Sequence, residues 1–343
     1  MISVVIPAYN RVALIGETLE GLLGQTLPAG EIIVVDDGST DGTAEVAESY
    51  GDIIRVIRQS NSGPAAARNR GFRESKGDFI HFFDSDDIPV LNKQACQNKA
   101  LLETGADVVI SPWVKGSFTG GVFKPENHVL QQKGIPAGDL IRHLLCDWAV
   151  VPQCCLFRRT ALEKITGFPP ELYVGEDQLL FLRLLLTGAK VTFCPDTLTL
   201  YRTDNIQDKL SGSAAGENRR RLHWAKFLIM ARMECLEHGI EPSQWSGYRE
   251  RVWAAAKDLE VIQSKPEAIM LRRQLLKILG KENIVSYALR SWLRQKFGGF
   301  QQRLIGRRGS SSLCMGPMTA DQWRLSNEVL LTINLEHPYS ARL

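Results

Sequence analysis

The sequence lacks a long hydrophobic run and a basic leader. No uninterrupted apolar stretch in its 343 residues approaches the roughly 20 residues that cross a bilayer. The chain opens with MISVVIPAYN, which is typical of a buried strand and not of a charged leader with an apolar signal segment. We therefore expect a cytoplasmic protein without a membrane span.

Metal-binding cysteine pairs and two nucleotide-binding motifs are also missing. The seven cysteines show no paired ligand spacing, and their odd number in a chain without a leader indicates free thiols. No G-x-G-x-x-G follows the first predicted strand, and no G-x-x-x-x-G-K-[ST] is present. These absences argue against a zinc site, a dinucleotide-dependent dehydrogenase and a P-loop NTPase.

What is present is an alternation of strand and helix patterns. Short apolar runs alternate with segments whose apolar residues recur at helical spacing. The predicted strands are 2–6, the run EIIVV, 53–58, 78–84 and 107–111, and the predicted helices are 14–23, a helix from about Thr43, 63–75 and 91–104. This order predicts an α/β fold with a mostly parallel sheet between helices.

Beyond Pro112 the pattern is looser. It predicts a hairpin at 116–123, helices at 137–146, 158–166 and 176–187, and one strand at 192–202. From about Gly212 the chain becomes helical and charged. We predict a catalytic α/β domain over residues 1–212 and a helical, basic C-terminal extension over residues 213–343.

Polar strings follow three of the predicted strands: PAYN, DDGSTD and DSDD. In sheets of this kind ligands bind outside the carboxyl ends of the strands, so we expect the three loops to line one crevice. DDGSTD is by itself typical of a turn. Asp37 at a strand end is also suited to accept a hydrogen bond from a nucleobase or a ribose.

The DSDD string places Asp84, Asp86 and Asp87 within four positions. Carboxylates this close repel one another unless a cation shares the site. Mg²⁺ and Mn²⁺ bind oxygen ligands, and Mg²⁺ usually combines one or two carboxylates with substrate phosphates. The string therefore predicts a metal ion bound largely through a diphosphate.

A family resemblance depends on five strings in a fixed order. They are PAYN at 7–10, DDGSTD at 36–41, SGPAAARNRG at 62–71, DSDD at 84–87 and GED at 175–177. Together they resemble the family-2 inverting glycosyltransferases with the GT-A fold, over about residues 1–205. The resemblance implies a nucleotide-sugar-binding GT-A domain that uses Mn²⁺ or Mg²⁺ and a UDP-sugar, and that transfers a hexose or an N-acetylhexosamine.

The resemblance also implies which residues bind the donor and the metal. The residues that it places at the nucleotide sugar are Pro7, Ala8, Tyr9, Asp37, Arg68, Asn69, Asp84, Ser85 and Asp86. It makes Asp86 the main metal ligand, and leaves open whether Asp84 or Asp87 completes the set. From the residues alone, Arg68 could instead be an exposed arginine and Asn69 a structural asparagine.

The GED string carries the implied catalytic base. In the resemblance Asp177 takes the proton of the acceptor hydroxyl, whereas the residue pattern alone is also met by an acid that stabilises a helix N-terminus. Tyr201 and Arg202 occupy the place where relatives carry a basic residue near the diphosphate, or are an ordinary edge-strand pair. No Q-x-x-R-W string follows Gln178, so we expect transfer of a single sugar to a hydroxyl of a glycan or glycolipid, as in the assembly of a cell-surface polysaccharide.

The C-terminal extension is strongly basic. Residues 270–308 contain ten Lys or Arg against one acid. The residues that share an apolar stripe at helical spacing there are Leu289, Trp292, Leu293, Phe297 and Phe300. Three interpretations stay open: internal packing of the stripe, peripheral binding to an anionic membrane surface, or nucleic-acid binding, for which no recognition motif is present.

Two alternative functions remain from the sequence. A sugar nucleotidyltransferase would need a Gly-rich, basic first loop, which PAYNRVALIGET lacks. A non-catalytic, nucleotide-binding scaffold at the membrane surface would keep the fold without turnover. We expect the metal-dependent inverting glycosyltransferase.

Overall fold

The first part of the chain folds as the predicted alternation of strands and helices. The computed structural model describes residues 1–119, 122–203, 214–262, 264–301 and 322. The elements in order are β1 (Ile2–Ala8), α1 (Ile15–Leu23), β2 (Glu31–Asp36), α2 (Thr43–Glu48), β3 (Ile54–Arg58), α3 (Pro64–Glu74), β4 (Phe79–Phe82), β5 (Ile88–Pro89), α4 (Lys93–Thr104) and β6 (Val108–Ile110).

The second part departs more from prediction. It contains β7 (Trp113–Thr119), β8 (Val122–Leu130), α5 (Leu140–Cys146), β9 (Cys155–Arg158), α6 (Arg159–Leu162), α7 (Glu176–Leu186), β10 (Val191–Phe193) and β11 (Thr199–Arg202). The single strand predicted over 192–202 is wrong, because β10 and β11 belong to different sheets. Pro195 lies between them and has no N–H for a strand ladder.

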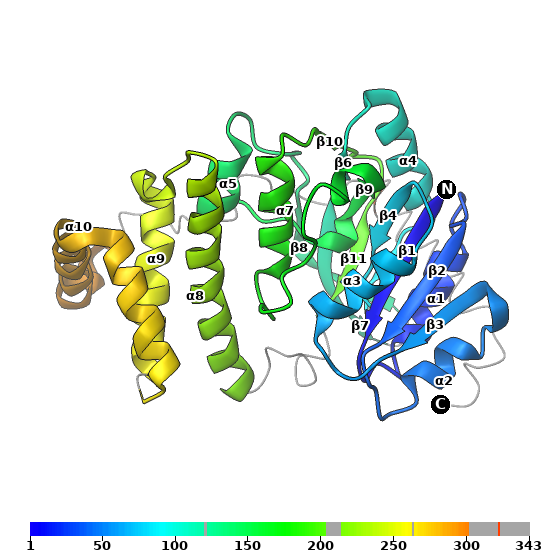
Figure 1. Cartoon of the computed structure of the whole chain (residues 1–343), viewed down its shortest axis with the longest axis horizontal. Helices are drawn as coiled ribbons and strands as arrows, with labels where there is room; N and C mark the ends of the chain where they lie inside the picture. Colours follow the sequence, from blue (N-terminus) through cyan, green and yellow to red (C-terminus); the bar gives the residue numbers. More distant parts are fainter. Residues whose placement is uncertain (120–121, 204–213, 263, 302–321, 323–343) are drawn as a thin grey trace.

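Two sheets position the loops of the site. The larger sheet has the order β10-β6-β9-β4-β1-β2-β3, and the smaller has the order β5-β11-β7-β8. In the larger sheet β9 runs antiparallel to β4 and β6, while the other pairs are parallel. The predicted α/β fold with a mostly parallel sheet between helices is confirmed (Figure 1).

Side chains of β1 alternate between the two faces of the larger sheet. Val4 and Ile6 join a buried cluster with residues of α1 and α4, whereas Val5 joins another on the opposite face. On that face α3 lies so close that a Cβ atom on Gly71 would be 2.2 Å from Val5 Cγ1. Glycine at this position lets α3 approach the carboxyl ends of β1 and β2.

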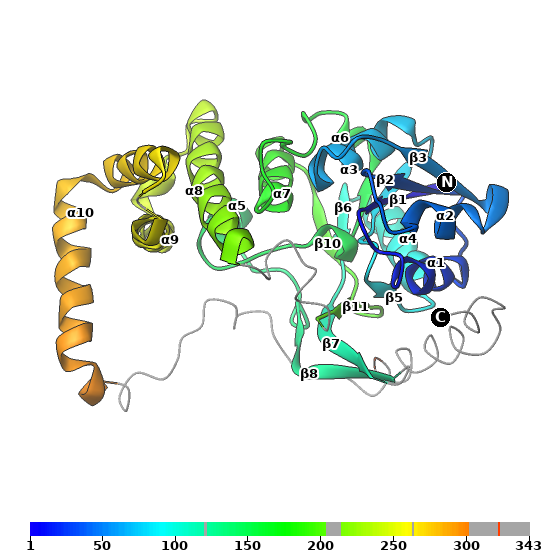
Figure 2. The same cartoon turned by 90° about the horizontal axis from the view of Figure 1, so that it is seen from below.

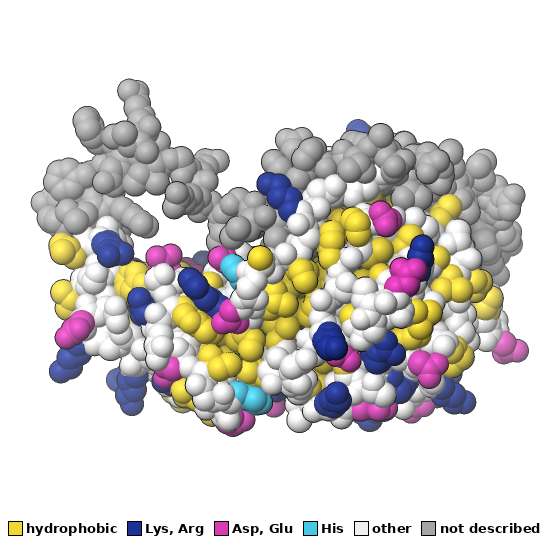
Figure 3. Space-filling view, turned by 90° about the horizontal axis from the view of Figure 1, so that it is seen from above, with side chains coloured by type: hydrophobic (Ala, Val, Ile, Leu, Met, Phe, Trp, Pro, Cys, Tyr) yellow, Lys and Arg dark blue, Asp and Glu magenta, His cyan; other side chains and the backbone are white. Residues whose placement is uncertain are grey.

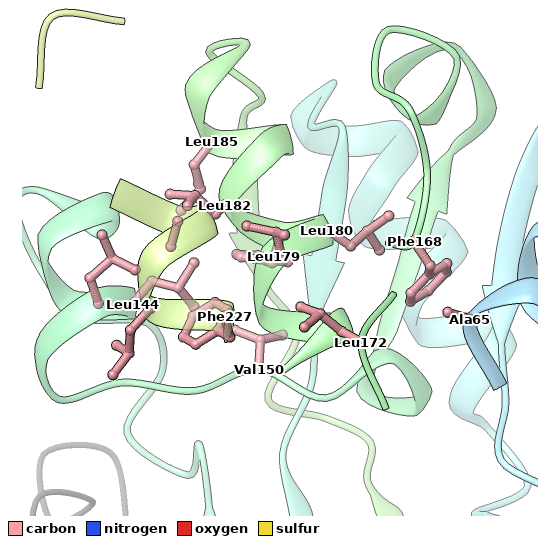
Figure 4. Close-up of a cluster of buried hydrophobic side chains, with 14 of the residues drawn as sticks. Ala65, Leu144, Val150, Phe168, Leu172, Leu179, Leu180, Leu182, Leu185 and Phe227 are labelled. Atoms are coloured by element: carbon pink, nitrogen blue, oxygen red, sulfur yellow. The ribbon is translucent and has the colours of Figure 1, made fainter. Parts of the chain in front are cut away.

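Of the C-terminal helices, α8 packs on α7, while α9 and α10 pack on α8 and extend away from the sheet (Figures 1 and 2). They are α8 (Ala214–Glu237), α9 (Ser246–Asp258) and α10 (Pro266–Gln301). Figure 4 shows Phe227 of α8 beside leucines of α7 in a cluster of buried apolar side chains. Two guanidinium nitrogens of Arg183 in α7 also donate hydrogen bonds to the Glu234 carboxylate of α8. The predicted boundary near residue 212 stays a prediction.

The structure describes only part of the predicted apolar stripe within the basic residues 270–308. α10 is interrupted at Gly280 (φ 72°), and Leu289 beyond it is exposed. The side chains of residues 292–301 and all of residues 302–308 lie outside the described residues. On the face shown in Figure 3, basic and acidic side chains are interspersed. No helix in the described ranges combines the length and the apolar character needed to cross a membrane.

Candidate active site

A cleft of about 730 Å³ opens where β1, β2 and β4 end. The loops that follow these three strands all contribute to its lining. The lining residues are Pro7, Ala8, Tyr9, Asn10, Arg11, Asp37, Asp41, Asn61, Gly63, Pro64, Arg68, Asp84, Ser85, Asp86, Tyr173, Val174, Glu176, Tyr201 and Arg219. The structure thus brings most of the predicted site residues together.

The loops after β1 and β2 are joined at one end of the cleft. Asn10 has a left-handed backbone (φ 51°), and its side-chain oxygen accepts a hydrogen bond from Thr40 N at 3.0 Å. Its own N–H donates to Ser39 Oγ at 2.9 Å. These bonds of Asn10 fix the loop that also carries Tyr9. Tyr9 is 44% exposed, so a ligand can contact its ring.

Asp37 is buried, and three donors from the described residues reach its carboxylate. Its Oδ1 accepts from Gln59 Nε2 (2.7 Å) and Ser62 N (2.9 Å), and its Oδ2 accepts from Gly63 N (2.8 Å). A carboxylate offers about four acceptor positions. One position on Oδ2 therefore remains for a ligand N–H or O–H.

The three acids of the DSDD turn have different surroundings. Asp84 accepts from Arg68 Nη2 at 2.8 Å, and Asp86 lies 3.7 Å from Arg11 Nε. Both line the cleft, with side-chain exposures of 26% and 14%. Asp87 is buried outside the cleft lining and accepts hydrogen bonds from Gln153 Nε2 (2.8 Å) and Arg202 N (3.0 Å).

These positions limit how a dication could be held. Within the described ranges, no three His, Cys, Asp or Glu side chains are grouped closely enough to bind a metal ion by themselves. Asp84 and Asp86 supply carboxylate oxygens from one turn, which fits a Mg²⁺ or Mn²⁺ site completed by ligand phosphates. Asp87, the third predicted ligand, instead fixes the turn.

Two predicted donor-binding residues make structural contacts. Arg68 Nη1 also donates to Glu176 Oε1 (3.2 Å), so this buried guanidinium joins the DSDD turn to α7. Asn69 does not line the cleft. Its side chain forms two hydrogen bonds with the backbone of Phe168, because successive residues of a helix point about 100° apart.

Glu176 and Asp177 also point differently at the start of α7. Glu176 lines the cleft, whereas Asp177 is not among the lining residues and its Oδ1 accepts from Gln178 N at 2.7 Å. Burial, with the neighbouring Asp177, raises the pKa of Glu176 to about 7. Burial also raises the pKa of Asp177 above its ordinary value.

Tyr201 and Arg202 are neighbours in β11 but make different contacts. Tyr201 lines the cleft. Arg202 is buried, its Nε donates to the Asp86 carbonyl oxygen at 3.1 Å, and its guanidinium pairs with Glu17 of α1. Arg202 therefore holds the backbone of the DSDD turn.

Several lining residues had no signal in the sequence. Arg11 and Asn61 occupy loops beside the recognised strings, where no spacing rule marks them. Tyr173 and Arg219 come from segments that are distant in sequence from the first three strands. Only the packing of α8 against the 173–175 segment brings Arg219 to the cleft.

Comparisons with known proteins agree with this geometry. A sequence model of the family described as "Glycosyl transferase family 2" matches residues 3–166. Glycosyltransferase GlyG of Streptococcus pneumoniae is 31% identical over 221 residues, which are 59% of this chain and 70% of GlyG.

Two solved structures resemble the fold. Staphylococcus aureus TarS 1–349, crystallised with UDP, gives a TM-score of 0.53 at 21% identity and covers 85% of this chain and 91% of that one. The mannosyltransferase PcManGT of Pyrobaculum calidifontis, in complex with GDP-Man and Mn²⁺, gives 0.50 at 19% identity and covers 89% of this chain and 88% of that one.

Proposed function

The chain belongs to glycosyltransferase family 2, and from this premise we propose that it transfers one sugar, with inversion, from a UDP-sugar to an acceptor hydroxyl. The observation that carries the proposal is the single cleft that joins Tyr9, Asp37, Asp84 and Asp86. TarS, which shares the fold, has been crystallised with UDP and with UDP-GlcNAc. The acceptor is a glycan, a glycolipid or a similar molecule.

The loops after β1 and β2 would bind the nucleoside. The ring of Tyr9 is exposed enough to contact a base, and the open acceptor position of Asp37 suits a base N–H or a ribose hydroxyl. Gly63 N and Ser62 N hold the Asp37 carboxylate on its inner side. A nucleotide therefore meets a carboxylate that is already oriented.

Asp84 and Asp86 would hold Mn²⁺ or Mg²⁺ together with the donor diphosphate. The ion, when bound, offsets the negative charge that grows on the leaving diphosphate. Asp86 is the main ligand, and Arg202 and Asp87 keep its turn in place. Mn²⁺ accompanies GDP-Man in the similar fold of PcManGT.

Transfer is a single displacement. The acceptor oxygen bonds to the anomeric carbon while the bond from that carbon to the diphosphate breaks on the opposite face, so UDP leaves. The acceptor proton passes to a carboxylate at the start of α7. Asp177 is the proposed base, and its raised pKa increases its basicity.

The remaining regions carry further proposals. Residues 1–212 form the catalytic GT-A domain, and residues 213–343 form the helical extension. The enzyme works in the cytoplasm, and residues 270–308 attach it peripherally to an anionic membrane surface.

The test is binding and turnover with a panel of nucleotide sugars. We expect UDP and UDP-sugars to raise the melting temperature in the presence of Mn²⁺ or Mg²⁺ more than GDP-mannose does, and a chelator to remove most of this shift. We also expect slow, metal-dependent release of UDP from one UDP-sugar. Equal stabilisation by all nucleotides with no turnover on any donor would contradict the proposal.

A further inference from the structure

Arg219 differs from the other two arginines of the cleft in its surroundings. Arg11 lies near Asp86, and Arg68 pairs with both Asp84 and Glu176. Among the described residues, no carboxylate lies within ion-pair distance of Arg219. Its guanidinium carbon instead lies 5.1 Å from the centroid of the Tyr173 ring. This exposed cation thus lines an acidic cleft and has no charged partner in the part of the chain that the structure describes.

One face of α8 holds Arg219 in this place. Arg219, His223 and Phe227 are four residues apart, so they lie on the same side of the helix. His223 Nδ1 accepts a hydrogen bond from Tyr173 N at 3.3 Å. Phe227 packs against Gly175, where an added Cβ atom would be 2.9 Å from Phe227 Cγ. The helix is therefore docked along the 173–175 segment.

The segment that α8 contacts leads directly into the catalytic helix. Gly175, with φ 84°, is the N-cap of α7. The contacts with Tyr173 and Gly175 fix Arg219 relative to Glu176, the next residue in the chain, which lines the same cleft. A cation fixed there adds positive charge from the C-terminal helices, whereas Arg11 and Arg68 of the cleft already lie beside acids.

The proposed function brings phosphate groups into this cleft, and the inference rests on it. Guanidinium binds phosphate through paired hydrogen bonds, and such charge-assisted bonds are stronger than neutral ones. We propose that Arg219, held over Tyr173 by α8, binds a phosphate group of a ligand in the cleft. That phosphate belongs either to the donor diphosphate or to a phosphate-bearing acceptor.

The first arm of the test compares UDP with uridine by isothermal titration calorimetry in the presence of Mg²⁺. If the donor supplies the phosphate, Arg219→Gln raises the Kd for UDP about tenfold or more and leaves the Kd for uridine unchanged. Arg219→Lys keeps the charge and loses less. Arg220→Gln is the matched control, because Arg220 is the exposed neighbour outside the cleft lining.

The second arm adds inorganic phosphate to protein saturated with UDP and Mg²⁺, and follows the ³¹P linewidth. If the acceptor supplies the phosphate, Arg219→Gln leaves UDP binding unchanged but abolishes the broadening seen with wild type and Arg220→Gln. Identical behaviour of Arg219→Gln and Arg220→Gln in both arms would overturn the inference. Failure of the wild type to bind either UDP or uridine would instead overturn the proposed function.

Discussion

At the scale of single residues, Glu176 and Asp177 share one helix turn but not one environment. Glu176 pairs with Arg68 and lines the cleft, whereas Asp177 accepts a hydrogen bond from the backbone of Gln178. In the proposed reaction, only one of these two carboxylates takes the proton from the hydroxyl of the acceptor. Substituting each separately distinguishes a base from a residue that positions Arg68.

We predict that Asp177→Asn keeps UDP binding and loses at least about 100-fold in transfer rate, because general bases contribute roughly 10²- to 10⁴-fold. Glu176→Gln is the comparison. It weakens the contact with Arg68, so we expect weaker donor binding and a smaller loss of rate. Initial rates at saturating donor, together with UDP titrations, measure both effects. Full turnover by Asp177→Asn would remove Asp177 from the mechanism.

A second residue-scale prediction concerns His81. Its ring is buried beside Lys93 and its Nε2 lies 3.3 Å from the Gln153 carbonyl oxygen, and burial lowers its pKa from 6.5 to about 3. Between these values the unfolded chain binds one more proton than the folded chain, so stability falls as the pH falls. From pH 7 to pH 5 this residue should cost about 2 kcal/mol of unfolding free energy.

Urea unfolding at both pH values measures this cost. We expect His81→Gln to be less stable at pH 7 but to lose less on acidification. His238→Gln serves as the control, because His238 is an exposed helix-end residue. A pH dependence in His81→Gln as steep as that of the wild type would contradict the assignment.

At the scale of elements, the approach of α3 to the sheet decides where Arg68 lies. Because a Cβ atom on Gly71 would overlap Val5, Gly71→Ala must push α3 outward. We predict a loss of roughly 1 to 3 kcal/mol in unfolding free energy, together with weaker UDP binding. Chemical denaturation and a UDP titration measure the two effects.

Gly16→Ala is the matched control for this packing argument. Gly16 also lies in a helix, and its added Cβ atom would meet only Tyr50 Oη at an ordinary 3.5 Å. Alanine is the better helix former by about 1 kcal/mol, so this variant should be neutral or stabilising. If both variants behaved alike, the close approach of α3 would not matter.

At the scale of the whole molecule, the C-terminal helices form two parts with different burial. Ala268, Leu271 and Leu275 of α10 lie in the same buried cluster as α7 and α8. Beyond Gly280, Val285 and Leu289 are exposed. A truncation after Gly280 therefore keeps the fully buried residues of α10, and removes the exposed part together with Ile284 and Tyr287, which pack partly buried against the cluster.

We predict that the full chain sediments with phosphatidylserine vesicles at low salt, and that this truncation reduces the bound fraction severalfold. Each basic residue near such a surface contributes about 1 kcal/mol, and salt screens the attraction. Phosphatidylcholine vesicles and a high-salt buffer are the controls. Equal sedimentation of the two chains would leave internal packing or nucleic-acid binding as the remaining interpretations of the basic segment.

The sequence by itself determined the mostly parallel α/β fold, the family and the loops of the cleft. Strand and helix periods are local properties of the chain, and the ends of parallel strands necessarily meet at one edge of a sheet. The spacing of the strings therefore places Tyr9, Asp37 and the DSDD turn at one edge of the sheet.

Tertiary structure alone decided the direction of each side chain and the contribution of α8. Asp87 and Asn69 face structural partners because their backbone positions turn them from the cleft. Arg219 reaches the cleft because Phe227 and His223 dock on the 173–175 segment. Contacts between segments so distant in sequence depend on how helices pack, and no local pattern records that.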